Sequence, residues 1–121
     1  MANPNIVNVT SILGETVQAD LTTTLTTEII AAPITGHVYK INSILVANID
    51  GSAAADVSVF ITKSGGSPIA IASTIAVPAD ATLSVLDKNN SFYLEEGDNI
   101  EAGASAAGDL TITISYEDIS S

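Results

Sequence analysis

The sequence predicts an all-β protein: a single-domain antiparallel β-sandwich or jelly roll of about eight strands over residues 1–121. Three observations favour this fold class. Apolar and polar residues alternate with a period of two in several runs, as in half-buried strands. Turn-forming Gly, Asn, Asp and Pro separate these runs, and from Asp50 onward they recur at a spacing typical of sandwiches and jelly rolls. No run shows a convincing helical period.

The apolar runs between these turn signals are short enough to be single strands. In chain order, we expect strands within residues 5–13, 16–30, 38–49, 56–62, 69–77, 82–87, 91–95 and 110–116. The Thr-rich stretch 16–30 alternates as well, and Thr favours extended backbone, so it predicts one strand or two strands with a bend. Residues 1–12 are either an arm that pairs with a neighbour's sheet edge or the first strand of the molecule's own sheet.

Alternation also predicts which face of each strand is buried. The run "LTITISY" places only apolar or aromatic residues on one face: Leu110, Ile112, Ile114 and Tyr116. The run "DVSVFIT" does the same with Val57, Val59 and Ile61. In the run 38–49, one face is expected to hold Tyr39, Ile41, Leu45, Ala47 and Ile49. Ile44 and Val46 add apolar area to the other face near the end of the run, so we expect a central strand that is covered on both sides there.

Charge and composition exclude several functions. Fourteen acidic residues face three Lys and no Arg, which gives a net charge of -11. Binding to nucleic acid or to anionic lipid relies on basic side chains, so neither partner is expected. The absence of Cys excludes disulfides and thiolate metal sites. We find no secretory signal pattern at the start and no apolar run long enough for a membrane helix.

The stretch "LEEGDNI" is the main candidate site, because Glu95, Glu96 and Asp98 crowd around Gly97. The spacing does not fit an EF-hand loop. Adjacent residues on a strand point to opposite faces, so Glu95 and Glu96 do not form a facing glycosidase pair. We therefore expect a hairpin turn between "SFYLE" and "NIEAGAS", with weak calcium binding by the three carboxylates as the functional alternative. No other metal and no cofactor is expected.

His37 is the single histidine, so a Ser-His-Asp triad would have to use it. The sequence contains no nucleophile-elbow motif, and His37 is expected at the surface near the start of a strand. The chain is therefore predicted not to be an enzyme.

Three segments together resemble small virion structural proteins of tailed bacteriophages, particularly those that infect marine cyanobacteria. They are "MANPNIVNVTSI", "YKINSILVANIDGSAAADVSV" and "SFYLEEGDNIEAGASAAGDLTITISYEDIS". The resemblance is weakest in residues 15–35 and 63–88, and it brings no set of functional residues with it.

This resemblance implies a component of the phage particle, made in the host cytoplasm. A compact, acidic domain without repeats favours a capsid decoration (cement) protein on the outer capsid surface. Its partners would be the major capsid protein and further copies of itself, with a trimer as one candidate state. The alternative is a neck, tail or fibre-associated virion protein that binds a glycan during host recognition.

Overall fold

The computed structural model describes residues 3–121, and within them the chain forms nine β-strands and one turn of 3-10 helix. The elements are β1 (Ser11–Asp20), β2 (Thr27–Ile30), β3 (His37–Asn48), β4 (Ala55–Thr62), β5 (Ile69–Val77), β6 (Thr82–Leu86), η1 (Lys88–Asn90), β7 (Phe92–Leu94), β8 (Asn99–Ala104) and β9 (Leu110–Ser120). No helix in this part of the chain is both long and apolar enough to cross a membrane.

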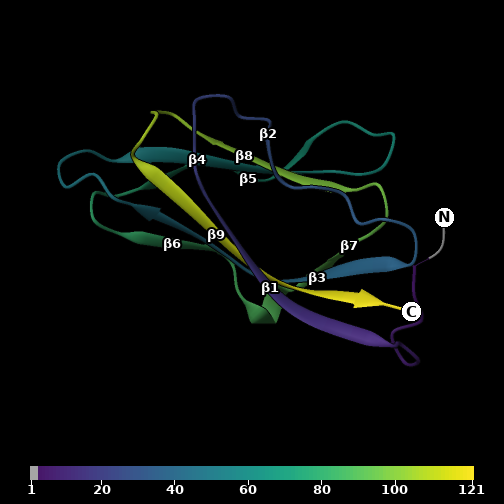
Figure 1. Cartoon of the computed structure of the whole chain (residues 1–121). Coiled ribbons are helices and arrows are strands. Elements are labelled where there is room, and N and C mark those ends of the chain that lie inside the picture. Colours follow the sequence, from purple (N-terminus) through teal and green to yellow (C-terminus); the bar gives the residue numbers. More distant parts are fainter. Residues whose placement is uncertain (1–2) are drawn as a thin grey trace.

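The strands form two antiparallel sheets that pack as two layers (Figure 1). One sheet has the order β1-β9-β3-β6, with β7 also paired to β3; the other has the order β2-β8-β4-β5. Because β9 occupies one side of β3, strands β6 and β7 lie end to end along its other side. The prediction of an antiparallel β-sandwich of about eight strands is confirmed, and β6 and β7 correspond to the strands expected within residues 82–87 and 91–95.

The core between the sheets is almost wholly aliphatic, because the sequence offers few aromatic side chains. Its largest fully buried side chains are Leu21, Ile41, Ile44, Val46, Val57, Val59, Val77, Leu94, Ile100, Leu110, Ile112 and Ile114. The predicted faces of β4 and β9 are confirmed, since every second residue of each run packs into or against this core. Fully burying one such side chain contributes about 1.5–3 kcal/mol.

Strand β3 departs from the predicted alternation because it contains a bulge. Its register against β9 shifts between Ile41 and Ser43, so Asn42 is an extra residue on the β3 side. Ile41 before the shift and Ile44 after it are both fully buried, although they are three residues apart. The prediction that Leu45 shares the face of Ile41 is therefore wrong, since Ile44 and Val46 point into the core beyond Asn42 and Leu45 is exposed. The expected central position of this strand is confirmed, because β3 lies between β9 and β6.

The Thr-rich stretch forms two strands in different sheets, β1 and β2, which was one of the two predicted alternatives. The register of β1 against β9 begins at Ser11. Residues 5–8 form a turn, in which the Asn8 amide donates to the Asn5 carbonyl at 2.9 Å, so the strand expected over residues 5–13 is wrong before its last few residues. Pro4 is buried, and it lines a surface hollow with Val38 of β3, so this segment covers part of the outer face of its own sheet.

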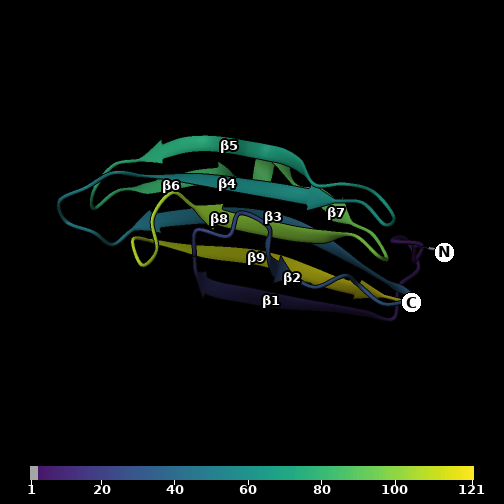
Figure 2. The ribbon, with the colours of Figure 1, turned by 90° about the horizontal axis from the view of Figure 1, so that it is seen from above.

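The outer strands β1 and β5 lie on opposite sides of the sandwich (Figure 2). Strand β1 pairs with β9 without interruption from Ser11 to Asp20. Strand β5 is less regular, because its register against β4 shifts twice and Thr74 has a φ of 53°. The Ser58 hydroxyl accepts a hydrogen bond from the Thr74 amide at 3.0 Å, which satisfies this bulged backbone.

Candidate functional site

Residues 95–98, here called the acidic turn, connect the two sheets. The turn follows β7, which pairs with β3, and precedes β8, which pairs with β2 and β4. The prediction of a hairpin is therefore wrong, because the strands on either side of the turn belong to different layers. The turn itself is closed by a 3.0 Å hydrogen bond from the Asp98 amide to the Glu95 carbonyl, with Gly97 at a φ of 84°.

Asp98 is the buried centre of the acidic turn, with a side chain only 2% exposed. Its Oδ1 accepts from the Ser64 amide at 2.9 Å, and its Oδ2 accepts from the Glu95 amide at 3.0 Å. Lys63 Nζ also donates to Oδ2, at 2.6 Å. Burial alone raises the pKa of Asp98, but these three hydrogen bonds outweigh it and hold the pKa below its ordinary value.

Lys63 bridges two carboxylates of the acidic turn. Its Nζ lies 2.6 Å from Asp98 Oδ2 and 2.9 Å from Glu95 Oε2. The hydrogen bond to Asp98 and then the one to Glu95 raise the pKa of Lys63, so its ammonium form is favoured. Lys63 and Ser64 follow β4 at the start of the β4–β5 connection, so this cluster ties that connection to the acidic turn.

The remaining side chains of the acidic turn reach other segments. Glu96 accepts a short hydrogen bond from the Thr35 hydroxyl, which lies just before β3. Glu95 Oε1 accepts from Asn3 Nδ2 at 3.1 Å. A Cβ at Gly97 would lie 2.6 Å from Ser64 Oγ, so both the backbone conformation and the close packing require glycine. The acidic turn thus contacts three other segments of the chain, which contain Asn3, Thr35 and Lys63.

The three carboxylates named as calcium candidates point to different partners. Asp98 faces the Lys63 ammonium group and two amides, Glu95 faces Lys63 and Asn3, and Glu96 faces Thr35. In residues 3–121, no group of three or more His, Cys, Asp or Glu side chains is arranged to hold a metal ion. Calcium binding at the acidic turn stays a prediction, and it would require these contacts to break.

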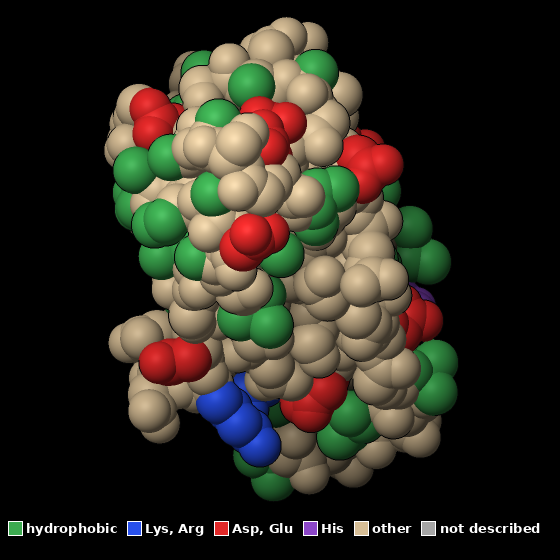
Figure 3. All heavy atoms as spheres, turned by 90° about the vertical axis from the view of Figure 1, so that its left-hand side faces the viewer, with side chains coloured by type: hydrophobic (Ala, Val, Ile, Leu, Met, Phe, Trp, Pro, Cys, Tyr) green, Lys and Arg blue, Asp and Glu red, His purple; other side chains and the backbone are tan. Residues whose placement is uncertain are grey.

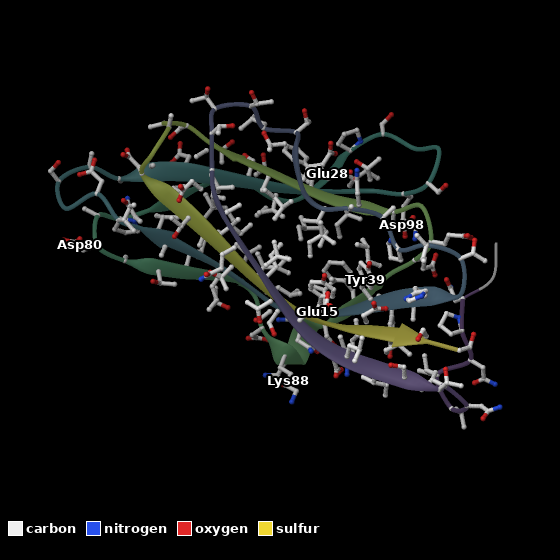
Figure 4. The ribbon with its side chains drawn as sticks, in the orientation of Figure 1. Glu15, Glu28, Tyr39, Asp80, Lys88 and Asp98 are labelled. Atoms are coloured by element: carbon white, nitrogen blue, oxygen red, sulfur yellow. The ribbon has the colours of Figure 1, made fainter. Side chains whose placement is uncertain are left out.

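A second polar cluster, which was not predicted from the sequence, lies where β1, β3 and β9 meet. The hydroxyl of Tyr116 donates to Glu15 Oε2 at 2.7 Å, and the ring of Tyr116 lies 4.8 Å from the ring of Tyr39. Burial, and then the hydrogen bond to Glu15, raise the pKa of Tyr116. Tyr39 and Glu15 are labelled in Figure 4, which also shows Asp98 at a distance from Glu15.

His37 is the first residue of β3, and its side chain is partly exposed. Its Nδ1 lies 2.8 Å from Asp118 Oδ1 on β9, which is a cross-strand neighbour near His37 in the sheet. This matches the expected position of a histidine at the start of a strand. Asp118 pairs with Tyr39, two residues along β3, so the pairing of the strands brings the two side chains together.

Two surface hollows are present in the described part of the chain, and His37 is not among the residues that line them. One, of about 300 Å³, is lined by Gln18, Ala19, Asp20, Thr111 and Thr113. The other, of about 240 Å³, is lined by Asn3, Pro4, Ile6, Val38, Tyr93 and Glu95. The end of the sandwich that faces the viewer in Figure 3 carries acidic side chains in separate patches, with hydrophobic side chains between them.

No protein-family model matches the sequence, and no curated protein matches it. Solved structures match the fold. A chain of the disulfide-linked pili that form Bacillus endospore appendages aligns over 91% of this chain and 88% of its own length, with 20% identity and a TM-score of 0.51. A chain in the acid-stable capsid of Helicobacter pylori bacteriophage KHP30 aligns over 93% of this chain and 90% of its own length, with 6% identity and a TM-score of 0.51.

At these identities the likeness establishes the fold alone. The structure of infectious bursal disease virus also matches, at 11% identity, but its TM-score is 0.43 and this chain covers only 32% of that chain. The β-sandwich described above is therefore a fold that occurs in a phage capsid and in a bacterial pilus, both of which are assembled particles.

Proposed function

We propose that this chain is a structural component of a bacteriophage particle, and specifically a decoration (cement) protein on the outer surface of the capsid shell. The observation that carries the proposal is the likeness to a chain in the capsid of phage KHP30. The alignment covers nine-tenths or more of both chains, so the two chains have similar lengths and the whole domain is matched. The proposal assigns no catalytic activity and no cofactor to the chain.

The connectivity of the strands supports the proposal. With β6 and β7 counted as one interrupted strand, the molecule has eight strands in two four-stranded sheets. Each sheet takes strands from both halves of the chain, and we interpret this order as a jelly roll. Jelly rolls are a common architecture of viral capsid domains.

The charge of the molecule suits a position on the outside of a shell. A net charge of -11 keeps the free protein soluble at high copy number and disfavours contact with packaged nucleic acid. The proposed partner is the major capsid protein, contacted at junctions between its subunits. Because each contact would be modest, several contacts made by one oligomer would raise the net affinity through effective concentration.

The test uses phage particles made with and without this protein. Mass spectrometry of purified particles is expected to find the chain, and particles that lack it are expected to release their genome at a lower temperature. Adding the purified protein back is expected to restore heat resistance, whereas an unrelated acidic protein of similar size is not. Absence from particles would contradict virion membership, and equal heat resistance without the protein would contradict the cement role alone.

The likeness to a pilus chain favours a second candidate, a subunit of a tail fibre or another filament. The matched pili are described as disulfide-linked, but this chain has no Cys, so such a filament would be held by non-covalent contacts. Glycan binding by such a fibre stays a prediction. A cryo-EM map of the particle separates the two roles, because a decoration protein covers the shell and a fibre subunit lies at the tail.

A further inference from the structure

The strands at the edges of the two sheets have unpaired backbone groups, which a strand of another molecule could pair with. Strand β2 is four residues long, its register shifts, and it carries Glu28. Strands β6 and β7 are five and three residues long, and η1 separates them. Strand β1 is ten residues long and regular, but it carries Glu15 and Asp20. Short length, irregularity and charge all protect edge strands from such pairing.

The fourth edge, β5, is neither short nor charged. It is nine residues long, and residues 64–79 around it contain no charged residue. Its sequence, "IAIASTIAV", is rich in branched aliphatic side chains, and Ile69, Ile71 and Ile75 are exposed. In the part of the chain that the structure describes, β5 pairs with β4 alone and lies on the outside of its sheet (Figure 2). A straight edge strand of this composition is expected to pair with other chains and to aggregate.

Strand β5 is not straight, because it contains two extra residues. Its nine residues lie opposite only seven residues of β4, Ala55–Ile61. The register shifts on either side of the pair formed by Val59 and Ala72. Each shift places one more residue on β5 than on β4, so both shifts are β-bulges, which bend a strand and increase its twist. A bulged edge is a poor template for a further strand.

The bulge at Thr74 is strained, and a buried side chain holds it. Thr74 has a φ of 53°, a conformation that a β-branched residue rarely adopts. Its amide donates to the hydroxyl of Ser58 on β4 at 3.0 Å, and Ser58 is only 5% exposed. Such strain persists only where the surrounding structure enforces it. We therefore propose that the bulges of β5, with the one at Thr74 fixed by Ser58, keep this uncharged edge from pairing with strands of other molecules.

This inference concerns the edge of a single molecule, and it does not depend on a location in a phage particle. The test removes one bulge and leaves the flanking pairs in place. Two residues of β5 lie between Ile75 and Ala72, but only one residue of β4 lies between their partners, so deletion of Thr74 makes the numbers equal. The deletion variant is expected to fold, as judged by circular dichroism, and to lose soluble protein to fibrils that bind thioflavin. The assay uses high salt, which screens the repulsion that a net charge of -11 supplies.

Two further variants distinguish edge pairing from a general loss of stability. Ile71→Lys, combined with the deletion, adds a charge to the same edge at a side chain that is 41% exposed, and it is expected to restore solubility. Tyr116→Phe removes a hydrogen bond away from β5, and this variant is expected to stay as soluble as the wild type. A folded deletion variant that stays soluble would overturn the proposal. It is also overturned if Ile71→Lys restores nothing, or if Tyr116→Phe loses as much soluble protein as the deletion.

Ser58→Ala tests the same bulge without a deletion. The Thr74 amide then loses its acceptor, so the bulge is weakened, and a smaller loss of soluble protein is expected than after the deletion. The matched control is Thr74→Gly, because glycine adopts the same φ without steric cost and keeps the bulge, so this variant is expected to stay soluble. If Ser58→Ala is as soluble as Thr74→Gly, the role of Ser58 is refuted. Should the deletion variant not fold, that same result overturns the whole proposal.

Discussion

Replacing Asp98 with Asn tests whether the acidic turn is a structural element. Asn retains one acceptor oxygen, which can still meet the Ser64 amide. Its NH₂ group then faces the Glu95 amide and Lys63 Nζ, which both donate to Asp98 Oδ2 in the wild type. A buried amide left without an acceptor costs about 1–3 kcal/mol. Lys63 is 56% exposed and can turn to water, so its lost contact adds only about 0–1 kcal/mol.

The expected loss of unfolding free energy for Asp98→Asn is therefore about 1–4 kcal/mol at pH 7. Urea unfolding followed by circular dichroism measures it, and the m-value is expected to stay unchanged. Asp20→Asn, which removes the same charge at the exposed end of β1, is the control and is expected to change stability by less than about 0.5 kcal/mol.

The pH dependence gives a second readout for Asp98. Its pKa is lowered in the folded state, so the stabilisation is fully present above the unfolded value of 3.8 and is lost as the pH falls through the folded pKa. The stability gap between wild type and Asp98→Asn is thus expected to narrow below pH 3.8. A gap that is absent at pH 7, or one that stays constant into acid, would refute this account of the turn.

Three further predictions concern the close packing at Gly103, the hydrogen bond of Tyr116 and the carboxylates of the acidic turn, which already have hydrogen-bond partners. Gly103→Ala is expected to lower the free energy of unfolding by about 1–3 kcal/mol in a urea titration, because a Cβ there would overlap the Leu25 Cα. The control is Gly14→Ala, whose Cβ would meet no atom within 4 Å, so it is expected to be neutral or slightly stabilising. Equal losses of unfolding free energy in the two variants would contradict this reasoning. Tyr116→Phe is expected to lose about 0.5–1.5 kcal/mol with the hydrogen bond to Glu15, and no loss in a thermal or urea melt would show that water replaces the bond. Calcium is expected to leave the melting temperature unchanged relative to a chelator, and a rise that disappears when Glu96 is replaced by Gln would establish a calcium site at the acidic turn.

Strict local alternation was enough to predict the buried faces of some strands. The alternation of β9 is unbroken from Leu110 to Tyr116, and its predicted face is buried. In β3 the same reasoning held as far as Ile41 and then failed, because the extra residue at Asn42 inverts the faces beyond it. A bulge is set by the pairing with a neighbouring strand, and its signal does not lie in the run itself.

The candidate site was predicted in its residues but not in its role. Gly97 and the carboxylates around it correctly indicated a tight turn. Whether such a turn joins paired strands or connects two sheets depends on long-range pairing, which local turn residues do not encode. Lys63 lies 35 residues from Asp98 in the sequence, so their ion pair also could not be read from spacing.

The position of β9 in its sheet has a consequence for how the chain folds. This strand comes last among the described elements, yet it lies between β1 and β3 and pairs with both. Its first partner is about a hundred residues away, since Ser11 pairs with Ser120. Pairings between such distant residues close slowly, because the loop entropy is lost before the contact forms. During synthesis, the edges of β1 and β3 that pair with β9 therefore stay unpaired until residues 110–120 have been made. In this interval the unpaired edges expose the nascent chain to aggregation.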